Sequence, residues 1–173
     1  MTLPIQTPRL LLVPYTTAQM RRALEQGFET AARSFGLSHP ALSWNDRRLR
    51  YNIYQNKLRI MEETPDAHLL TTAWQITADG AIVGEVGFKG PPTLGEIEIG
   101  YTTHAGHRRH GYMTEAVAAL CAFAFEQTTY DVVSIAALTR RRNFASQGVL
   151  TKCGFVRDGT QGLWLLRWVL EKG

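Results

Sequence analysis

The residues with the clearest chemical potential in this 173-residue chain lie in one short loop. Two arginines and a histidine at positions 108–110 precede Gly111, and apolar residues recur at helical spacing from Met113 to Ala124. The first backbone N–H groups of a helix have no partners within it, so they can bind a phosphate. Glycine lets a ligand approach the backbone, and the basic side chains add positive charge. The sequence therefore predicts a phosphate site at the start of this helix.

The loop can be compared with known phosphate-binding patterns. It matches neither the G-x-x-x-x-G-K-[ST] loop nor the G-x-G-x-x-G dinucleotide fingerprint. The six residues from Arg108 to Met113 instead resemble the R-x-x-G-x-[GA] pyrophosphate loop of the GNAT N-acetyltransferase superfamily, with Met113 in place of the usual small residue. The resemblance implies that the ligand is acetyl-CoA.

Four further segments extend this resemblance along the whole chain, in the order of the RimJ/RimL-type subgroup, whose members acetylate protein N-termini. They are Thr7–Leu12, Glu98–Tyr101, Asn143–Ser146 and Lys152–Phe155, which resemble the opening strand, the fourth strand, an N-x-x-S motif and a late helix end. The resemblance implies a single α/β domain over residues 1–173. Its expected fold is GNAT-like, with a mixed, mostly antiparallel central sheet that helices flank and that splays open at the acyl-CoA site.

Composition restricts the class of protein without identifying it. Hydrophobic residues make up 45% of the chain and charged residues 20%, as in ordinary globular proteins, and no run is long and apolar enough for a membrane helix. Nineteen Lys and Arg against fifteen Asp and Glu give a net charge of +4. This excess suits an anionic cofactor, but it forms no stripe of the kind that nucleic-acid binders use. Without a targeting segment or a disulfide framework, we expect a cytoplasmic protein, either a monomer or a homodimer.

Apolar periodicity and turn residues predict the secondary structure. The expected strands are residues 9–15, 69–77, 81–89, 95–103, 132–139, 155–157 and 163–170. The expected helices are 17–26, a short one after 28, one that ends before Pro65, one from 111 onward, and 144–153. Thr17 is expected to cap the first helix and Asn45 or Asp46 the third. Asp79-Gly80 predicts a hairpin.

Glu98 and Asp158 are the two candidates for the base that a reaction with an amine requires. Glu96 and Glu98 share one face of a predicted strand, where Glu is depleted unless that face is wet or functional. An ammonium has no lone pair, so a carboxylate acting through water could remove its proton. Glu98 is the preferred base, with simple solvent exposure as the alternative. Asp158 follows the Gly154-Phe155 pair, where some relatives carry Glu, and is the reserve.

The motif that begins at Asn143 allows two interpretations. Asn143 could simply cap the helix that follows it, with Ser146 in the first turn. The resemblance implies instead that Asn143 holds the pantetheine arm of the cofactor. It also implies that Ser146 protonates the leaving thiolate, because Leu150 stands where many relatives have a tyrosine.

The resemblance defines a complete cofactor site. The pyrophosphate is expected on the Arg108–Thr114 loop, and the pantetheine on the backbone near Tyr101 and Thr103. The expected cofactor-binding residues are Tyr101, Thr103, Arg108, Arg109, His110, Gly111, Met113, Thr114 and Asn143. An amine, on a protein N-terminus or a small molecule, would then attack the thioester directly.

The first two helices of the resembled family form one wall of the acceptor groove. Candidate acceptor contacts are therefore Phe35, Trp44, Tyr51 and Tyr54, with ordinary core packing as the alternative.

Other functions are weaker. A metal site at His104, His107 and His110 is rejected because no carboxylate or thiol stands beside them and neighbouring arginines would repel a cation. The cluster at 140–142 is either solvated surface or a contact for the 3′-phosphate of coenzyme A. The runner-up function is a non-catalytic CoA-sensing module or a basic module that binds nucleic acid or the ribosome.

Overall fold

The computed structural model of the protein describes residues 4–34 and 36–173. The strands in these ranges are β1 Ile5–Gln6, β2 Leu11–Pro14, β3 Ala73–Ala78, β4 Ala81–Phe88, β5 Glu96–Thr103, β6 Ser134–Arg140, β7 Val156–Gln161 and β8 Leu165–Glu171. The α-helices are α1 Thr17–Gln26, α2 Phe28–Arg33, α3 Trp44–Glu63, α4 His68–Thr71, α5 Tyr112–Phe125 and α6 Phe144–Lys152. Two 3₁₀ turns, η1 Pro65–Ala67 and η2 Ala105–His107, complete the elements.

The described strands form one sheet in the order β1-β2-β3-β4-β5-β6-β8-β7. Each neighbouring pair is antiparallel except β5 and β6, which run parallel because α5 crosses over between them. This is the mixed, mostly antiparallel sheet that the resemblance to the GNAT superfamily implies.

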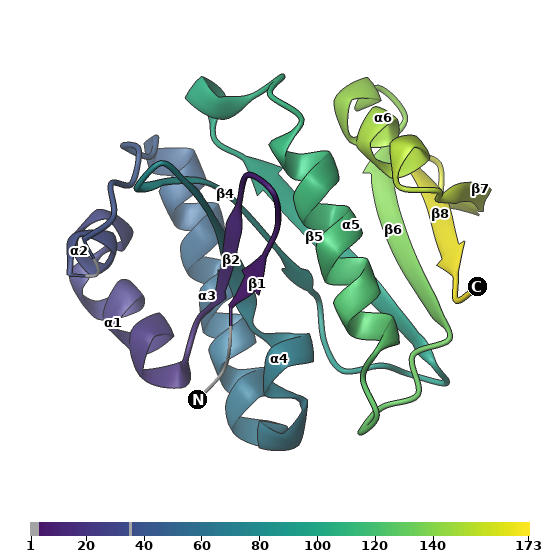
Figure 1. Ribbon diagram of the computed structural model, residues 1–173, viewed down its shortest axis with the longest axis horizontal. Coiled ribbons are helices and arrows are strands. Elements are labelled where there is room, and N and C mark those ends of the chain that lie inside the picture. Colours follow the sequence, from purple (N-terminus) through teal and green to yellow (C-terminus); the bar gives the residue numbers. More distant parts are fainter. Residues whose placement is uncertain (1–3, 35) are drawn as a thin grey trace.

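The parallel pair is the place where the sheet opens. The register of β5 with β6 runs from Glu96–Ser134 to Ile99–Ala137 and goes no further. Beyond it, β5 continues to Thr103 against β4, and β6 continues to Arg140 against β8. Figure 1 shows the two strands spreading apart toward the end at which η2 and α6 lie.

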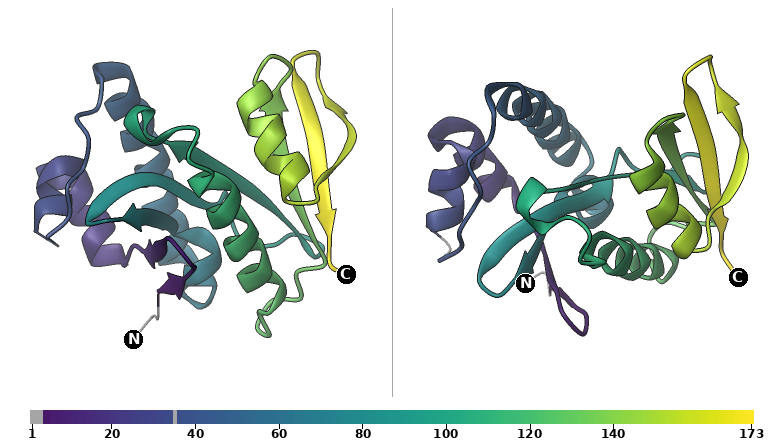
Figure 2. Two further views of the ribbon diagram at one scale, coloured as in Figure 1. Left: turned by 45° about the horizontal axis from the view of Figure 1, so that its top comes forward. Right: turned by 90° about the horizontal axis from the view of Figure 1, so that it is seen from above.

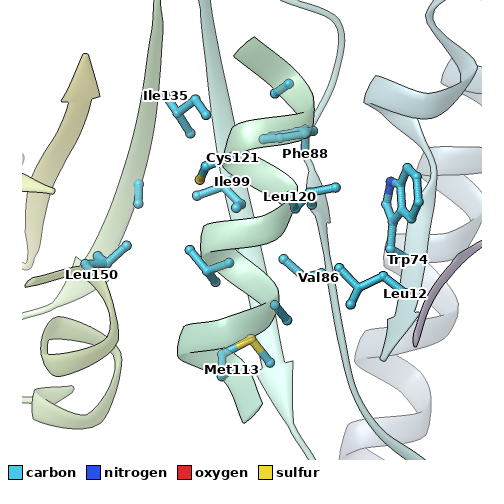
Figure 3. Packing of buried hydrophobic residues seen from close by; sticks show 14 of the residues in the cluster. Leu12, Trp74, Val86, Phe88, Ile99, Met113, Leu120, Cys121, Ile135 and Leu150 are labelled. Atoms are coloured by element: carbon cyan, nitrogen blue, oxygen red, sulfur yellow. The ribbon is translucent and has the colours of Figure 1, made fainter. Parts of the chain in front are cut away.

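Helices cover both faces of the sheet. Figure 2 shows α5 and α6 on one face and α1 to α3 on the other. On the first face, Leu120 and Cys121 of α5 pack against Ile99, Val86 and Phe88 of the strands (Figure 3). On the second face, a separate buried cluster joins α1, α2 and α3 to the sheet through Tyr15, Met20, Phe28, Tyr54 and Met61.

Sequence patterns located the elements well and some of their ends poorly. The predicted Asp79-Gly80 hairpin is confirmed, with φ of 49° and 75° at the two residues, as a type I′ turn requires. The strand expected from residue 69 begins only at Ala73, because residues 68–71 form a helical turn.

The predicted helix caps were wrong by one to three residues. Thr16, not Thr17, caps α1, since its side chain accepts from Gln19 N while the Gln19 side chain accepts from Thr16 N. Ser43, not Asn45 or Asp46, caps α3, because its hydroxyl accepts from Asp46 N.

Candidate active site

A cavity of about 680 Å³ lies where β5 and β6 separate. Its walls come from the end of β5, the loop before α5, the start of α5 and the first turns of α6. The lining residues are Tyr101, Thr102, Thr103, His107, Arg108, Arg109, Gly111, Tyr112, Met113, Thr114, Asn143, Phe144, Ala145, Ser146, Gly148, Val149 and Lys152. Helix N-termini therefore flank this cavity on two sides.

The loop before α5 has a backbone that favours glycine. Gly111 is the N-cap of α5 and has φ of 78°, in the left-handed region, and Arg109 also has a positive φ, of 67°. A Cβ atom at Gly111 would come within 3.2 Å of Arg9 Nη2. The loop therefore turns sharply and presents its backbone, rather than side chains, at the start of the helix.

Arg9, from the segment before β2, holds this loop in place. Its Nε donates to Glu115 Oε2 at 2.7 Å, and its Nη1 donates to the carbonyl oxygen of His110 at 2.8 Å. Glu115 Oε1 also accepts from the Thr7 hydroxyl at 2.6 Å and from Arg9 N at 3.0 Å. Burial raises the pKa of Glu115, but these hydrogen bonds outweigh it and lower the pKa below its usual value.

The backbone of β5 faces the cavity at Tyr101 and Thr103. Lys89 N donates to Glu98 O and His104 N donates to Val83 O, so even-numbered residues of β5 bond to β4. The N–H and C=O groups of odd-numbered residues then point toward β6. Because the pairing with β6 ends at Ile99, the backbone groups of Tyr101 and Thr103 have no strand partner among the described residues.

The start of α6 forms the opposite wall. Asn143 is its N-cap, and Asn143 Oδ1 accepts from Ser146 N at 3.2 Å, so the capping interpretation of this motif is confirmed. Both residues also line the cavity. The Tyr101 hydroxyl donates to Ser146 O at 3.0 Å and ties the two walls together, and burial raises the pKa of Tyr101.

Of the predicted cofactor-binding residues, all but His110 line this cavity. The exposed His110 ring stacks on Tyr112 with centroids 5.4 Å apart. The arginines at 140–142 do not line it either; Arg141 Nε donates to Leu163 O at 3.0 Å. Lys152 lines it and was not predicted, although it stands in the Lys152–Phe155 segment.

The two carboxylates predicted as bases lie in surface ion pairs. Glu98 is paired with Lys89, and Asp158 of β7 is paired with Arg167. Neither carboxylate lines the cofactor cavity or the cavities described next. A base role for either stays a prediction.

The face of β4 and β5 that α3 covers holds two more cavities, of about 430 Å³ and 310 Å³. We call them the acceptor cavities because α3 belongs to the part of the chain expected to form the acceptor groove. Both are lined by Tyr54 and Glu85, and both share Tyr101 and Thr102 with the cofactor cavity. The three cavities therefore meet at one point of β5.

Among the predicted acceptor contacts, only Tyr54 lines an acceptor cavity. Trp44 and Tyr51 are exposed on α3, and Phe35 lies outside the described residues.

The sequence did not predict a buried polar cluster that lies beside these cavities. Arg50 and Glu85 form an ion pair in which both side chains are about nine-tenths buried. His104 is also buried, and its ring meets the His39 ring edge to face at a centroid distance of 5.0 Å. The available signal was Glu85 itself, a lone charge in the apolar run Ala81–Phe88, since buried charges usually have a structural or functional partner.

Burial and the neighbouring Arg50 guanidinium lower the pKa of His104 from its usual 6.5 to about 3. Its Nε2 has no hydrogen-bond partner in the part of the chain that the structure describes. His104 is therefore a neutral imidazole in the folded protein at neutral pH.

Comparison with known proteins agrees with this geometry. The family model described as "Acetyltransferase (GNAT) domain" matches residues 9–156. The chain therefore belongs to the GNAT acetyltransferase domain family, as the loop at 108–113 predicts. Over 76 residues it is 43% identical to the uncharacterized N-acetyltransferase YjdG of Bacillus subtilis, and this match spans 43% of this chain and 44% of that protein.

Solved structures share the fold over nearly the whole chain. The ribosomal-protein-S5-alanine acetyltransferase of Vibrio fischeri has a TM-score of 0.68 at 14% identity, covering 98% of this chain and 97% of that one. Mycobacterium smegmatis RimJ, in complex with a CoA disulfide, has a TM-score of 0.64 at 18% identity, covering 97% of this chain and 85% of that one. The predicted likeness to the RimJ/RimL type is confirmed at the level of fold.

The described residues contain neither a membrane-spanning helix nor a cluster of metal ligands. In residues 4–34 and 36–173, no helix is long and apolar enough to cross a membrane. In the same ranges, His, Cys, Asp and Glu side chains form no group of three that could hold a metal ion.

Arg9→Ala should weaken acetyl-CoA binding although Arg9 does not line the cofactor cavity. The substitution removes the hydrogen bonds from Arg9 to Glu115 and to the carbonyl oxygen of His110. The loop before α5 is then less ordered in the free protein, and ordering it on binding lowers the affinity for acetyl-CoA. We expect a Kd roughly tenfold higher, about 1.4 kcal/mol, by calorimetry. Arg21→Ala, which removes an exposed ion pair between α1 and α3, is the matched control. Equal affinities in the two variants would contradict the role of Arg9.

His104 should make the fold sensitive to acid. Below pH 6.5 the unfolded chain protonates this imidazole, whereas the folded protein does so only near pH 3, so the free energy of unfolding falls as the pH drops through this window. At pH 5 the loss is about 2 kcal/mol. His104→Asn should flatten the pH dependence of urea unfolding between neutral pH and pH 5. The same change at the exposed His110 should leave it as in the wild type; an unchanged slope in His104→Asn would refute the assignment.

Proposed function

We propose that the protein is an N-acetyltransferase that moves the acetyl group of acetyl-CoA to a primary amine by direct attack. The observation that carries the proposal is the junction at Tyr101 and Thr102, where the cofactor cavity meets the acceptor cavities. A donor thioester on one side and an amine on the other can approach each other there. Family membership supports acetyl-CoA as the donor.

The residues present fit acetyl-CoA. The N–H groups at the start of α5, which follow the left-handed Gly111, suit the pyrophosphate. Arg108, Arg109 and Lys152 add positive charge around the same cavity. The unpartnered N–H and C=O groups of Tyr101 and Thr103 suit the amides of the pantetheine, which can extend along β5 like a short strand.

The chain's own residues then hold and orient the reactants. When bound, acetyl-CoA supplies an activated acyl group as its thioester. The neutral amine attacks the thioester carbon, a C–N bond forms, and the C–S bond breaks with its electron pair left on sulfur. Ser146, in the first turn of α6, lines the cavity and is proposed to pass a proton to the departing thiolate while its hydroxyl takes up a proton from water.

The acceptor is proposed to be an amine on a protein N-terminus or a small molecule. The acceptor cavities, of about 430 Å³ and 310 Å³, are large enough for one or two residues of a peptide and leave the rest outside. RimJ and the S5-alanine acetyltransferase share the fold of this chain, and this supports an N-terminal amine only by analogy.

Gly111→Glu should abolish measurable acetyl-CoA binding. The substitution places a Cβ within 3.2 Å of Arg9 Nη2, on a residue with φ of 78°, and adds a negative charge at the helix N-terminus that is proposed to hold the phosphates. Gly111→Asn is the matched control, since Asn tolerates the left-handed conformation and adds no charge; it should lose less affinity. Calorimetry on folded variants measures both. Unchanged affinity in Gly111→Glu would refute this phosphate site.

A panel of nucleophiles tests the activity itself. Thiol release from acetyl-CoA is followed with peptides of varied N-terminal residue, small primary amines, alcohols and water. We expect release that depends on a primary amine, with the N-acetyl product seen by mass spectrometry. A preference for non-amine nucleophiles across the panel would end the proposal.

A further inference from the structure

Glu85 is the one carboxylate that β4 directs toward the acceptor cavities. It is 8% exposed, and it lies in register with Thr102 on the neighbouring strand. Residues in register on an antiparallel pair share a face, with Cβ atoms about 4.5–5.5 Å apart. Thr102 belongs to the junction of the three cavities. The Glu85 side chain therefore stands beside the point at which donor and acceptor meet.

The two oxygens of Glu85 have different surroundings. Oε1 accepts from Arg50 Nη1 and from the Tyr54 hydroxyl, and both donors come from α3. No described residue donates to Oε2. Among the described residues, His104 Nε2 is the one enclosed side-chain N or O atom without a hydrogen-bond partner. Oε2 has no such partner either, so it is not enclosed. Oε2 is therefore accessible, and Glu85 is a lining residue of both acceptor cavities.

The other carboxylates near the junction are less suited to meet an amine. Glu98 and Asp158 lie in ion pairs outside the three cavities. Asp46 lines the larger acceptor cavity, but it sits at the start of α3, where Oδ2 accepts from the Ser43 hydroxyl at 2.5 Å. Of these four carboxylates, Glu85 alone lies in register with Thr102 of β5 and has a carboxylate oxygen, Oε2, without a hydrogen-bond donor.

The groups packed around Glu85 favour a neutral amine. From α3 come Arg50, Tyr54 and Lys57, and from the strands and loops come Tyr15, His39 and His104. Lys57 Nζ donates to three carbonyl oxygens, and burial lowers its pKa to about 8, with Glu85 acting in the opposite direction. Two cations beside one carboxylate disfavour an ammonium, so a bound amine gives up its proton more readily than in water.

We propose that Glu85 is the catalytic carboxylate that accepts the acceptor's proton, directly or through one water molecule. This inference rests on the proposed function and deepens it. Oε2 accepts a hydrogen bond from the amine and orients its lone pair toward the thioester carbon. Before attack, Oε2 takes one proton from the bound ammonium and passes it to solvent, which frees the lone pair on nitrogen. As the C–N bond forms and the C–S bond breaks, nitrogen loses a second proton to water. The thiolate keeps the electron pair of the C–S bond.

Glu85→Gln is the main test. Gln can still accept the two hydrogen bonds on one atom, but the amide on the other side cannot take a proton. Turnover of the preferred primary amine from the panel should fall by roughly 10²–10⁴-fold. Hydroxylamine, which is weakly basic and already neutral at neutral pH, should lose less than about tenfold. Glu96→Gln, which removes an ion-paired carboxylate on β5 outside the cavities, is the matched control and should keep wild-type rates.

The fold is checked by thermal melting and by acetyl-CoA affinity, which should be unchanged in both variants. If Glu85→Gln does not fold, Glu85→Asp replaces it, because Asp keeps the charge and moves the carboxylate back by one methylene. It too should lose more turnover with the primary amine than with hydroxylamine.

Each remaining outcome has one meaning. If Glu85→Gln loses turnover equally with the primary amine and with hydroxylamine, Glu85 has only a structural role. If Glu85→Gln keeps near-normal turnover, Glu85 takes no part in the reaction. A large loss in Glu98→Gln with none in Glu85→Gln would assign the base to Glu98. Failure of the wild type on every amine would overturn the proposed function itself, and this is seen before any Glu85 variant is made.

Discussion

The early end of the pairing between β5 and β6 is the constraint on which the site depends. Buried or not, backbone N–H and C=O groups require partners, and beyond Ile99 and Ala137 the two strands no longer supply them to each other. The N-termini of α5 and α6, at Gly111 and Asn143, flank the same opening. An elongated ligand with a phosphate end and an amide arm satisfies both kinds of group at once.

In the proposed reaction, the alternation of β5 separates the two reactants. Its odd-numbered backbone groups face the opening toward β6, whereas the side chain of Thr102 lies on the α3 face beside Glu85. Tyr101 and Thr102 line all three cavities, so in this proposal the donor and the acceptor approach each other at these two residues. On the face that α3 covers, Arg50 and Glu85 form a buried ion pair. Loss of either side chain would leave the charge of the other one buried and uncompensated.

Sequence reasoning succeeded where the signal is local. The glycine loop, the Asp79-Gly80 hairpin and the period of β5 each depend on neighbours in the chain, and each was predicted in its place. It failed where partners are distant. Arg9 meets Glu115 across 106 positions, and Arg50 meets Glu85 across 35, so no spacing rule reveals either pair. Glu98 drew attention because it stands in a recognisable motif, whereas the structure pairs it with Lys89.

The most direct test of this account is amide hydrogen exchange of β5 with and without acetyl-CoA. The N–H groups of Gly100 and Thr102 bond to β4 and should exchange slowly in both states, whereas those of Tyr101 and Thr103 should exchange rapidly in the free protein. Addition of acetyl-CoA should slow exchange at Tyr101 or Thr103 and leave Gly100 and Thr102 unchanged. Equal exchange at Tyr101 and Thr103 in the two states, at saturating acetyl-CoA, would contradict the placement of the cofactor between β5 and β6.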